Sequence, residues 1–102
     1  MNWEVVEESI AKVSRTGVIR YMSVDNPSHI HRMDGPAVVF PTGTRQYWQY
    51  GQLHREDGPA IIYAQDLDGN TRLIPALNQK RWFIRGRELT EEEFNQMGYP
   101  RP

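Results

Sequence analysis

A heptapeptide that occurs twice constrains the fold of this chain more than any other feature. It reads His31-Arg32-Met33-Asp34-Gly35-Pro36-Ala37 and again His54-Arg55-Glu56-Asp57-Gly58-Pro59-Ala60. The two copies differ only at their third position, and His54 lies 23 positions after His31. Because internal repeats of this length are typical of stacked supersecondary units, we expect a chain built from similar segments.

The Asp-Gly-Pro part of each copy is a turn sequence. Asp can close a local turn through its side chain, glycine can adopt positive φ, and proline fixes its own φ. Each copy leads into an apolar run of strand-forming residues, 37–40 and 60–63. The pattern therefore predicts a turn followed by a strand, twice. A structural role in these turns is assigned to His31, Arg32, Asp34, Gly35, Pro36, His54, Asp57, Gly58 and Pro59.

Aromatic strands alternate with these apolar strands, and weaker copies of the unit flank the clear one. Gly17 and Tyr21 have the same spacing as Gly43 and Tyr47, and segment 82–86 matches segment 47–51. We predict a mainly β (α+β) fold, an antiparallel meander of about five or six hairpin strands. The predicted strands are residues 17–24, 37–40, 45–50, 60–64, 71–74 and 81–85.

The two ends of the chain predict short helices. Trp3, Val6, Ile10 and Val13 have helical spacing, which favours an N-terminal helix within residues 1–15. A strand from Trp3 to Val6 is the alternative. Thr90 followed by Glu91-Glu92-Glu93 is a capping box, so a C-terminal helix is expected over 90–98, with a tail at 99–102. Residues 1–102 are thus expected to form one domain, with hairpin repeats over 16–89.

The repeated unit resembles a known family. Two aromatic residues, two further residues and a glycine, followed by His-Arg-x-Asp-Gly-Pro-Ala, are similar to the MORN-variant repeats of small bacteriophage proteins and bacterial antitoxin-like proteins. The resemblance extends from about Gly17 to Phe94 and is most specific at residues 31–37 and 47–60. It implies a meander of antiparallel β-hairpins. It implies no single activity, because the functions within the family are diverse.

Composition excludes several classes of protein. The 102 residues carry a net charge of −1 and no cysteine, so a disulfide framework, a thiolate zinc site and a cysteine nucleophile are impossible. The mean hydropathy of −0.70 and the lack of a long apolar run argue against a membrane protein. The N-terminal residues lack the basic and apolar regions of a secretory signal. A cytoplasmic location is therefore expected, in the host cytoplasm if a phage encodes the protein.

Binding to another protein is the function that the sequence favours. The predicted strands carry apolar groups on both faces, and two short helices cannot cover both. Trp, Tyr and Arg are favoured anchors in protein interfaces. The candidate binding residues are Tyr47, Trp48, Tyr50, Arg55, Trp82 and Arg85. Together with the resemblance, they predict a non-enzymatic inhibitor of a bacterial defence or toxin protein, and an open sheet edge also allows a homodimer.

Other functions find less support in the sequence. Aromatic residues beside arginine could stack nucleic-acid bases or a nucleotide, although the near-neutral net charge argues against this. His29, His31 and Asp34 could contribute to a metal site, but the equivalence of His31 and His54 favours a structural role. Arg32 and Arg55 could bind an anion, or pair with Asp34 and Asp57 in their own turns, which we favour. No catalytic motif is present, so neither an enzyme nor a cofactor is expected.

Overall fold

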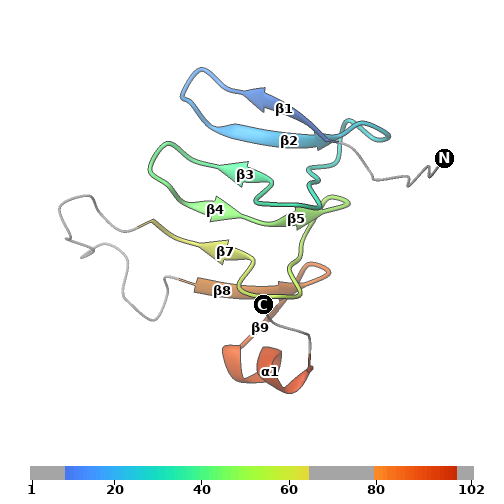
Figure 1. Cartoon of the computed structure of the whole chain (residues 1–102), viewed down its shortest axis with the longest axis vertical. Helices are drawn as coiled ribbons and strands as arrows, with labels where there is room; N and C mark the ends of the chain where they lie inside the picture. Colours follow the sequence, from blue (N-terminus) through green and yellow to red (C-terminus); the bar gives the residue numbers. More distant parts are fainter. Residues whose placement is uncertain (1–8, 65–79, 99–102) are drawn as a thin grey trace.

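The computed structural model describes residues 9–64 and 80–98, and these residues form a mainly β structure (Figure 1). Seven strands make one sheet, two strands make a second, and one short helix follows. The elements are β1 (Ser9–Val13), β2 (Ile19–Ser23), β3 (Val38–Val39), β4 (Arg45–Gln46), β5 (Trp48–Gln49), β6 (Gln52–Leu53), β7 (Ile61–Ile62), β8 (Lys80–Ile84), β9 (Arg87–Leu89) and α1 (Glu91–Gln96).

The order of the strands in space follows the order of the chain. The larger sheet runs β1-β2-β3-β4-β7-β8-β9, and every neighbouring pair is antiparallel. The strands β5 and β6 form a separate hairpin between β4 and β7 in sequence. Strand β1 and helix α1 therefore lie at opposite ends of the sheet (Figure 1).

Most of the predicted strands are present, with differences in their limits. The predicted strand 45–50 is divided at Tyr47, whose N–H donates to Ala60 O at 2.7 Å while its carbonyl accepts from His54 N–H at 3.0 Å. The partner of the strand thus changes at this residue, and β5 pairs with β6 instead of β7. Strands β6 and β9 were not predicted, and the predicted strand 71–74 lies outside the described residues.

The predicted N-terminal helix is wrong for residues 9–13, which form β1. This strand pairs with β2 along its whole length, from Ser9 opposite Ser23 to Val13 opposite Ile19. A tight turn joins the two strands, with Gly17 at φ 88° and its N–H donating to Ser14 O at 3.0 Å. Helical spacing of apolar residues was misleading here because Val13 is 68% exposed and faces no core. The rest of the predicted helix and the alternative strand at 3–6 lie outside the described residues.

The predicted C-terminal helix and its capping box are confirmed. Thr90 Oγ1 accepts from Glu93 N–H at 3.0 Å, and Glu93 Oε1 accepts from Thr90 N–H at 2.9 Å. The helix contacts β8 and β9, and it buries Phe94 to 1% exposure. The capping box thus fixes the start of α1, and the burial of Phe94 holds the helix against the end of the sheet.

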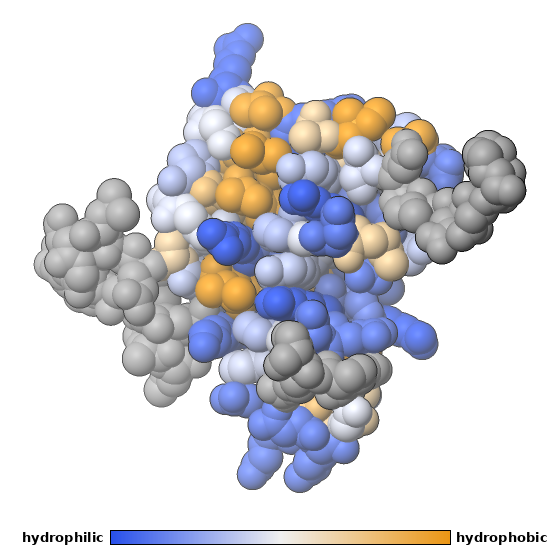
Figure 2. Space-filling view, in the orientation of Figure 1, coloured by the Kyte–Doolittle hydropathy of each residue, from blue (hydrophilic) through white to orange (hydrophobic). Residues whose placement is uncertain are grey.

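A small core leaves part of the sheet surface apolar. Ala60, Ile61 and Phe83 form a buried cluster, and the other buried hydrophobic residues within 9–64 and 80–98 are Ala37, Val38 and Phe94. The strand register places the side chains of Val13, Ile19 and Val39 in one line across the sheet, and Arg45 separates them from Ile62. Figure 2 shows hydrophobic side chains gathered in a column across the strands, so this face of the sheet carries apolar surface toward solvent.

An ion pair between β8 and β9 gives a prediction on pH dependence. Arg81 donates from Nε and Nη2 to the two oxygens of Glu88, both at 2.8 Å, and these bonds hold the pKa of Glu88 below its ordinary value. A lowered pKa in the folded state stabilises the fold above the pKa of the unfolded chain, and this stability is lost as pH falls through the folded pKa.

We expect Glu88→Gln to reduce the free energy of unfolding at neutral pH by less than about 1 kcal/mol, because solvent screens this half-exposed pair. Urea unfolding of wild type and variant at neutral pH and at about pH 3 measures the difference, which should be smaller in acid. An equal difference at both pH values would show that the carboxylate charge does not cause it.

Candidate functional site

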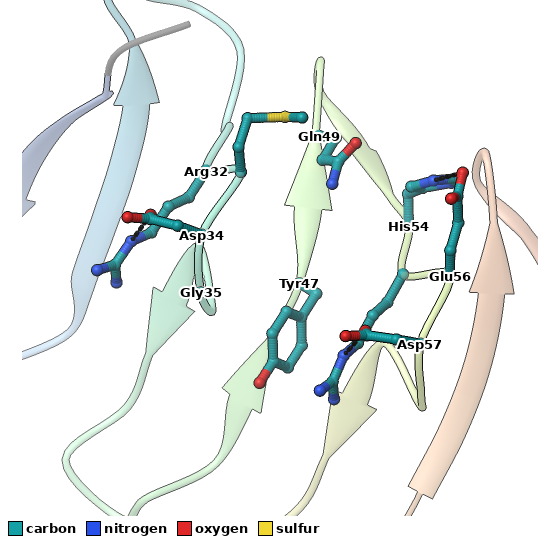
Figure 3. Close-up of a pocket in the computed structure, with 10 residues that line it drawn as sticks. Arg32, Asp34, Gly35, Tyr47, Gln49, His54, Glu56 and Asp57 are labelled. Carbon is teal, nitrogen blue, oxygen red and sulfur yellow. Dashed lines mark hydrogen bonds and ion pairs between the residues drawn. The ribbon is translucent and has the colours of Figure 1, made fainter. Parts of the chain in front are cut away.

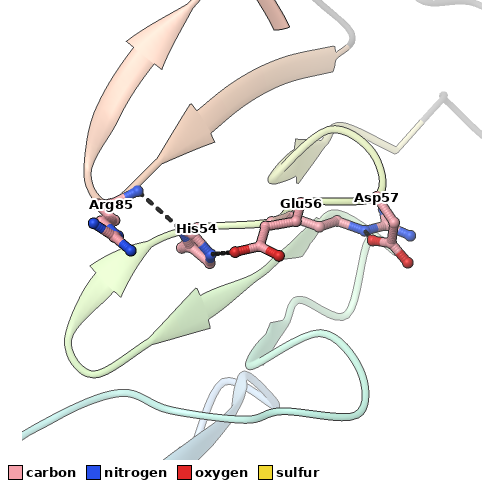
Figure 4. Close-up of polar contacts among 5 residues, drawn as sticks. His54, Glu56, Asp57 and Arg85 are labelled. Atoms are coloured by element: carbon pink, nitrogen blue, oxygen red, sulfur yellow. Dashed lines mark hydrogen bonds and ion pairs between the residues drawn. The ribbon is translucent and has the colours of Figure 1, made fainter. Parts of the chain in front are cut away.

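The histidine of each heptapeptide binds the tip of the next hairpin. His31 Nδ1 accepts from Tyr50 N–H at 2.9 Å. His54 Nδ1 accepts from Arg85 N–H at 2.9 Å (Figure 4). Tyr50 and Arg85 have φ of 52° and 50°, and each precedes a glycine that also has positive φ. Both are therefore the first central residues of type I′ turns, which few residues other than Gly, Asn and Asp adopt. The histidine supplies a buried acceptor that favours this backbone.

Neighbouring backbone bonds are the same in the two copies. Ile30 O accepts from Gly51 N–H at 2.9 Å, and Leu53 O accepts from Gly86 N–H at 2.8 Å. Because Nδ1 accepts a hydrogen bond in both rings, the hydrogen-bond network assigns the ring proton of the neutral histidine to Nε2. In the second copy this nitrogen lies 3.2 Å from Glu56 Oε2. The two histidines thus have matching positions and matching backbone partners.

The arginine of the first copy is held inside its own turn. Arg32 Nε donates to Asp34 Oδ1 and its Nη1 donates to Pro36 O, both at 3.2 Å. The guanidinium carbon lies 3.9 Å from the centroid of the Tyr21 ring. These contacts combine an ion pair, a backbone hydrogen bond and a cation–π interaction. The expected pairing of Arg32 with Asp34 is confirmed.

The arginine of the second copy repeats these contacts. Arg55 Nε donates to Asp57 Oδ1 at 2.8 Å, its Nη1 donates to Pro59 O at 3.2 Å, and its guanidinium carbon lies 4.0 Å from the Tyr47 ring centroid. Arg55 was predicted to be a binding residue, and the structure shows two of its three guanidinium nitrogens hydrogen-bonded within its own turn. Its pairing with Asp57 confirms the alternative in which the turn supplies its own partner.

The glycines of the Asp-Gly-Pro turns were expected to adopt positive φ, but the structure shows another reason for glycine at these positions. Positive φ occurs at other glycines, and Gly35 and Gly58 do not have it. A Cβ atom at Gly35 would lie 3.2 Å from Arg32 Cζ, and one at Gly58 would lie 3.1 Å from Arg55 Cζ. The guanidinium group crosses directly over each glycine, so the absence of a side chain permits the arginine contacts described above.

A groove of about 630 Å³ lies between the two turns. Tyr47 and Gln49 lie on the strand segment between the turns (Figure 3). One wall comes from the first heptapeptide and the other from the second. The wall residues are Arg32, Met33, Asp34, Gly35, His54, Arg55, Glu56 and Asp57. Neither copy could form this groove alone.

The position that differs between the copies faces this groove from both sides. Met33 is 48% exposed, and the side chain of Glu56 is 54% exposed. Gln49 is half-buried beside them, and its side-chain amide makes no hydrogen bond within the described residues. The groove therefore joins an apolar side chain, a carboxylate and an amide with free bonding capacity, while the residues shared by the two copies hold its walls.

The predicted binding residues do not form one surface. Tyr47 and Arg55 line the groove, but the guanidinium group covers one face of the tyrosine ring, and the ring also packs against the core. Tyr50 is 55% exposed and its ring centroid lies 4.4 Å from that of His31. Arg85 is exposed at the equivalent turn position of the last hairpin.

The two predicted tryptophans are half-buried in the strands. Trp48 Nε1 donates to Gln46 Oε1 at 2.9 Å, and Trp82 pairs with Leu89 across β8 and β9. The binding residues predicted from the sequence did not include Met33, Gln49 and Glu56, although these three line the groove. The difference at the third position of the heptapeptide was the signal that could have identified two of them.

His29 and His31, the histidines considered as metal ligands, have different environments in the fold. His31 is fully buried, whereas the half-buried His29 lies near Gly51, where an added Cβ would be 3.2 Å from its ring. Over residues 9–64 and 80–98, no three or more His, Asp or Glu side chains are placed to hold a metal ion. In the same ranges, no helix has the length and apolar character needed to cross a membrane.

Comparison with known protein families, with characterised proteins and with solved structures gives no match for this chain.

Proposed function

We propose that this protein is a non-enzymatic binding module that holds an extended segment of a partner protein in the groove between its two heptapeptide turns. The observation that carries this proposal is the groove itself, whose walls come from both copies and whose volume is about 630 Å³. A concave site with a few exposed polar groups on a fixed framework suits the recognition of a peptide segment.

The lining of the groove indicates the chemistry of the bound segment. Met33 offers an apolar wall, and Gln49 can bond to a peptide N–H or C=O group. On the other wall, Asp57 Oδ1 accepts from Arg55, while no hydrogen bond from residues 9–64 or 80–98 is directed at Oδ2, and Glu56 is half exposed. The acidic side chains outnumber the two arginines. We therefore expect a partner segment that places an apolar side chain beside a basic one.

Binding of nucleic acid through an aromatic strand face receives less support. Stacking needs an open ring face, but Arg55 covers one face of Tyr47 and the core packs against the ring. The guanidinium groups of Arg32 and Arg55 also have their own carboxylate partners, which reduces their attraction for phosphate. Protein binding therefore remains the function that we propose.

The biological setting follows from the resemblance described above. We propose that the chain belongs among the MORN-variant repeat proteins and is a small phage-encoded or antitoxin-like inhibitor of a bacterial defence or toxin protein. The matching contacts of the two turns support the repeat assignment, since the same residue types make the same hydrogen bonds 23 positions apart. An inhibitor needs a binding groove but no catalytic group of its own.

Affinity capture from a bacterial lysate, with and without nuclease, tests the proposed function. We expect wild-type protein to retain one host protein in both conditions, and Met33→Lys to reduce its recovery at least about tenfold, because an ammonium group replaces the apolar wall and repels a basic side chain. The matched control is Met97→Lys, since Met97 is also 48% exposed but lies at the end of α1.

The outcomes separate the two function classes. Loss of the partner with Met33→Lys but not with Met97→Lys supports the groove. Retention by both variants would show that the partner binds elsewhere. Recovery of nucleic acid, or of proteins that disappear after nuclease treatment, would overturn the proposal in favour of nucleic-acid binding.

A further inference from the structure

We propose that β1 is a self-association edge, through which two copies of this chain form a symmetric dimer with antiparallel β1 strands paired about Ala11. The proposal goes beyond the groove and does not depend on the proposed function. It rests on the direction of the backbone groups of β1, on the exposure of its side chains and on the complementarity of its sequence with itself.

The backbone groups of alternate residues in β1 point away from the sheet. Tyr21 N–H donates to Ala37 O at 2.8 Å and its carbonyl accepts from His31 N–H, so both groups of Tyr21 point away from β1. Tyr21 lies opposite Ala11, which makes this a pair without hydrogen bonds between the two strands. The N–H and C=O groups of Ala11 therefore face the open edge, and so do those of Ser9 and Val13.

The side chains of β1 are exposed on both faces of the sheet. Ile10 is 55% exposed on one face and Val13 is 68% exposed on the other. Edge strands are usually protected by proline, a bulge or several charges, and the strand Ser9–Val13 carries only Lys12. At the opposite end of the sheet, β9 carries charged residues and contacts α1. Among the described residues, the edge formed by β1 is thus the less protected one.

A second copy fits this edge because the strand is complementary to itself. A two-fold axis at Ala11 places the Ala11 residues of the two copies opposite each other, and Ser9 opposite Val13 of the second copy. These are the residues whose backbone groups face outward, so each pair can exchange hydrogen bonds. Ile10 then lies opposite Lys12 of the second copy, whose aliphatic stem can cover it, and neither lysine faces another lysine directly.

Light scattering after size-exclusion chromatography, over protein concentrations from about 1 µM to 1 mM, tests the proposal. We expect wild-type protein to form a dimer that dissociates on dilution. Ala11→Lys and Ala11→Glu should each be monomeric, because like charges meet at the axis. A mixture of the two variants should restore a dimer, since Lys and Glu then face each other. Gln96→Lys and Gln96→Glu, on the exposed surface of α1, are matched controls and should remain dimeric.

A cross-linking variant makes the test independent of added charge. The chain has no cysteine, so Ala11→Cys introduces one thiol per copy. Directly opposed residues in this pairing have a Cα–Cα distance of about 5.5 Å, within the range of a disulfide. Mild oxidation should give covalent dimers of Ala11→Cys much faster than of Gln96→Cys. Monomeric wild-type protein throughout the concentration range, dimeric Ala11→Lys, or equal cross-linking of the two cysteine variants would each overturn the proposal.

Discussion

Replacement of His31 by alanine is expected to lower the free energy of unfolding by about 2–4 kcal/mol, from a lost hydrogen bond together with a new cavity. The side chain is 0% exposed, so its removal leaves a void that the surrounding strands cannot readily fill. Tyr50 N–H loses its acceptor at 2.9 Å, and the Tyr50 ring loses its contact with the imidazole. Urea unfolding followed by tryptophan fluorescence measures the change.

Two further histidine variants show whether this effect comes from the repeated turn. His54→Ala should destabilise the protein to a similar extent, because Arg85 N–H loses the same acceptor. His29→Ala should cost less than about 1 kcal/mol, since His29 is half-buried and its contact with Asn26 is 3.5 Å long. If all three variants lost the same stability, the special role of the repeated histidine would be contradicted.

Replacement of Phe94 by alanine is expected to have an equal or larger effect, about 3–5 kcal/mol. Phe94 is 1% exposed and is the buried residue of α1, so the variant loses the packing of the helix on the end of the sheet. A capping box contributes too little to hold an isolated helix of six residues. We expect α1 to unfold in the variant even where the sheet persists.

Thermal unfolding and amide hydrogen exchange of the Phe94→Ala variant test this prediction. Protection should disappear in α1, and the midpoint of unfolding should fall by more than about 10 °C for a domain of this size. Gln96→Ala is the control, because Gln96 is exposed on the same helix and its loss should change stability by less than about 0.5 kcal/mol. A small effect of Phe94→Ala would mean that α1 does not depend on its contact with β8 and β9.

Short sequence motifs correctly predicted the helix and strands that depend on residues close together in the chain. The capping box at Thr90 predicted α1, and the apolar runs after each Asp-Gly-Pro turn predicted β3 and β7. The structure of β1 was not predictable in the same way, since the spacing of Ile10 and Val13 favours a helix and places the two side chains on opposite faces of a strand. What decides it is the pairing of five residues with β2, which the spacing of apolar residues does not encode.

The contacts of the two repeated histidines join residues that are distant in sequence. His31 and Tyr50 are 19 positions apart, and His54 and Arg85 are 31 positions apart. A repeat identifies equivalent residues but not their partners, so the histidines were assigned to the turns without knowledge of the hairpin tips that they bind. The same limit applies to Gly35 and Gly58, where the repeat indicated a required glycine and only the structure showed the arginine above it.

The two heptapeptides are equivalent units, and this equivalence rests on the way each binds the tip of the next hairpin through a histidine acceptor. Long-range ¹⁵N–¹H correlation spectra of the imidazole rings at mildly alkaline pH test it most directly, because they report which ring nitrogen carries the proton. We expect His31 and His54 both to carry the proton on Nε2 and to have an unprotonated Nδ1, while the amides of Tyr50 and Arg85 exchange slowly. A proton on Nδ1 of either ring, or averaging between the two tautomers, would contradict this equivalence.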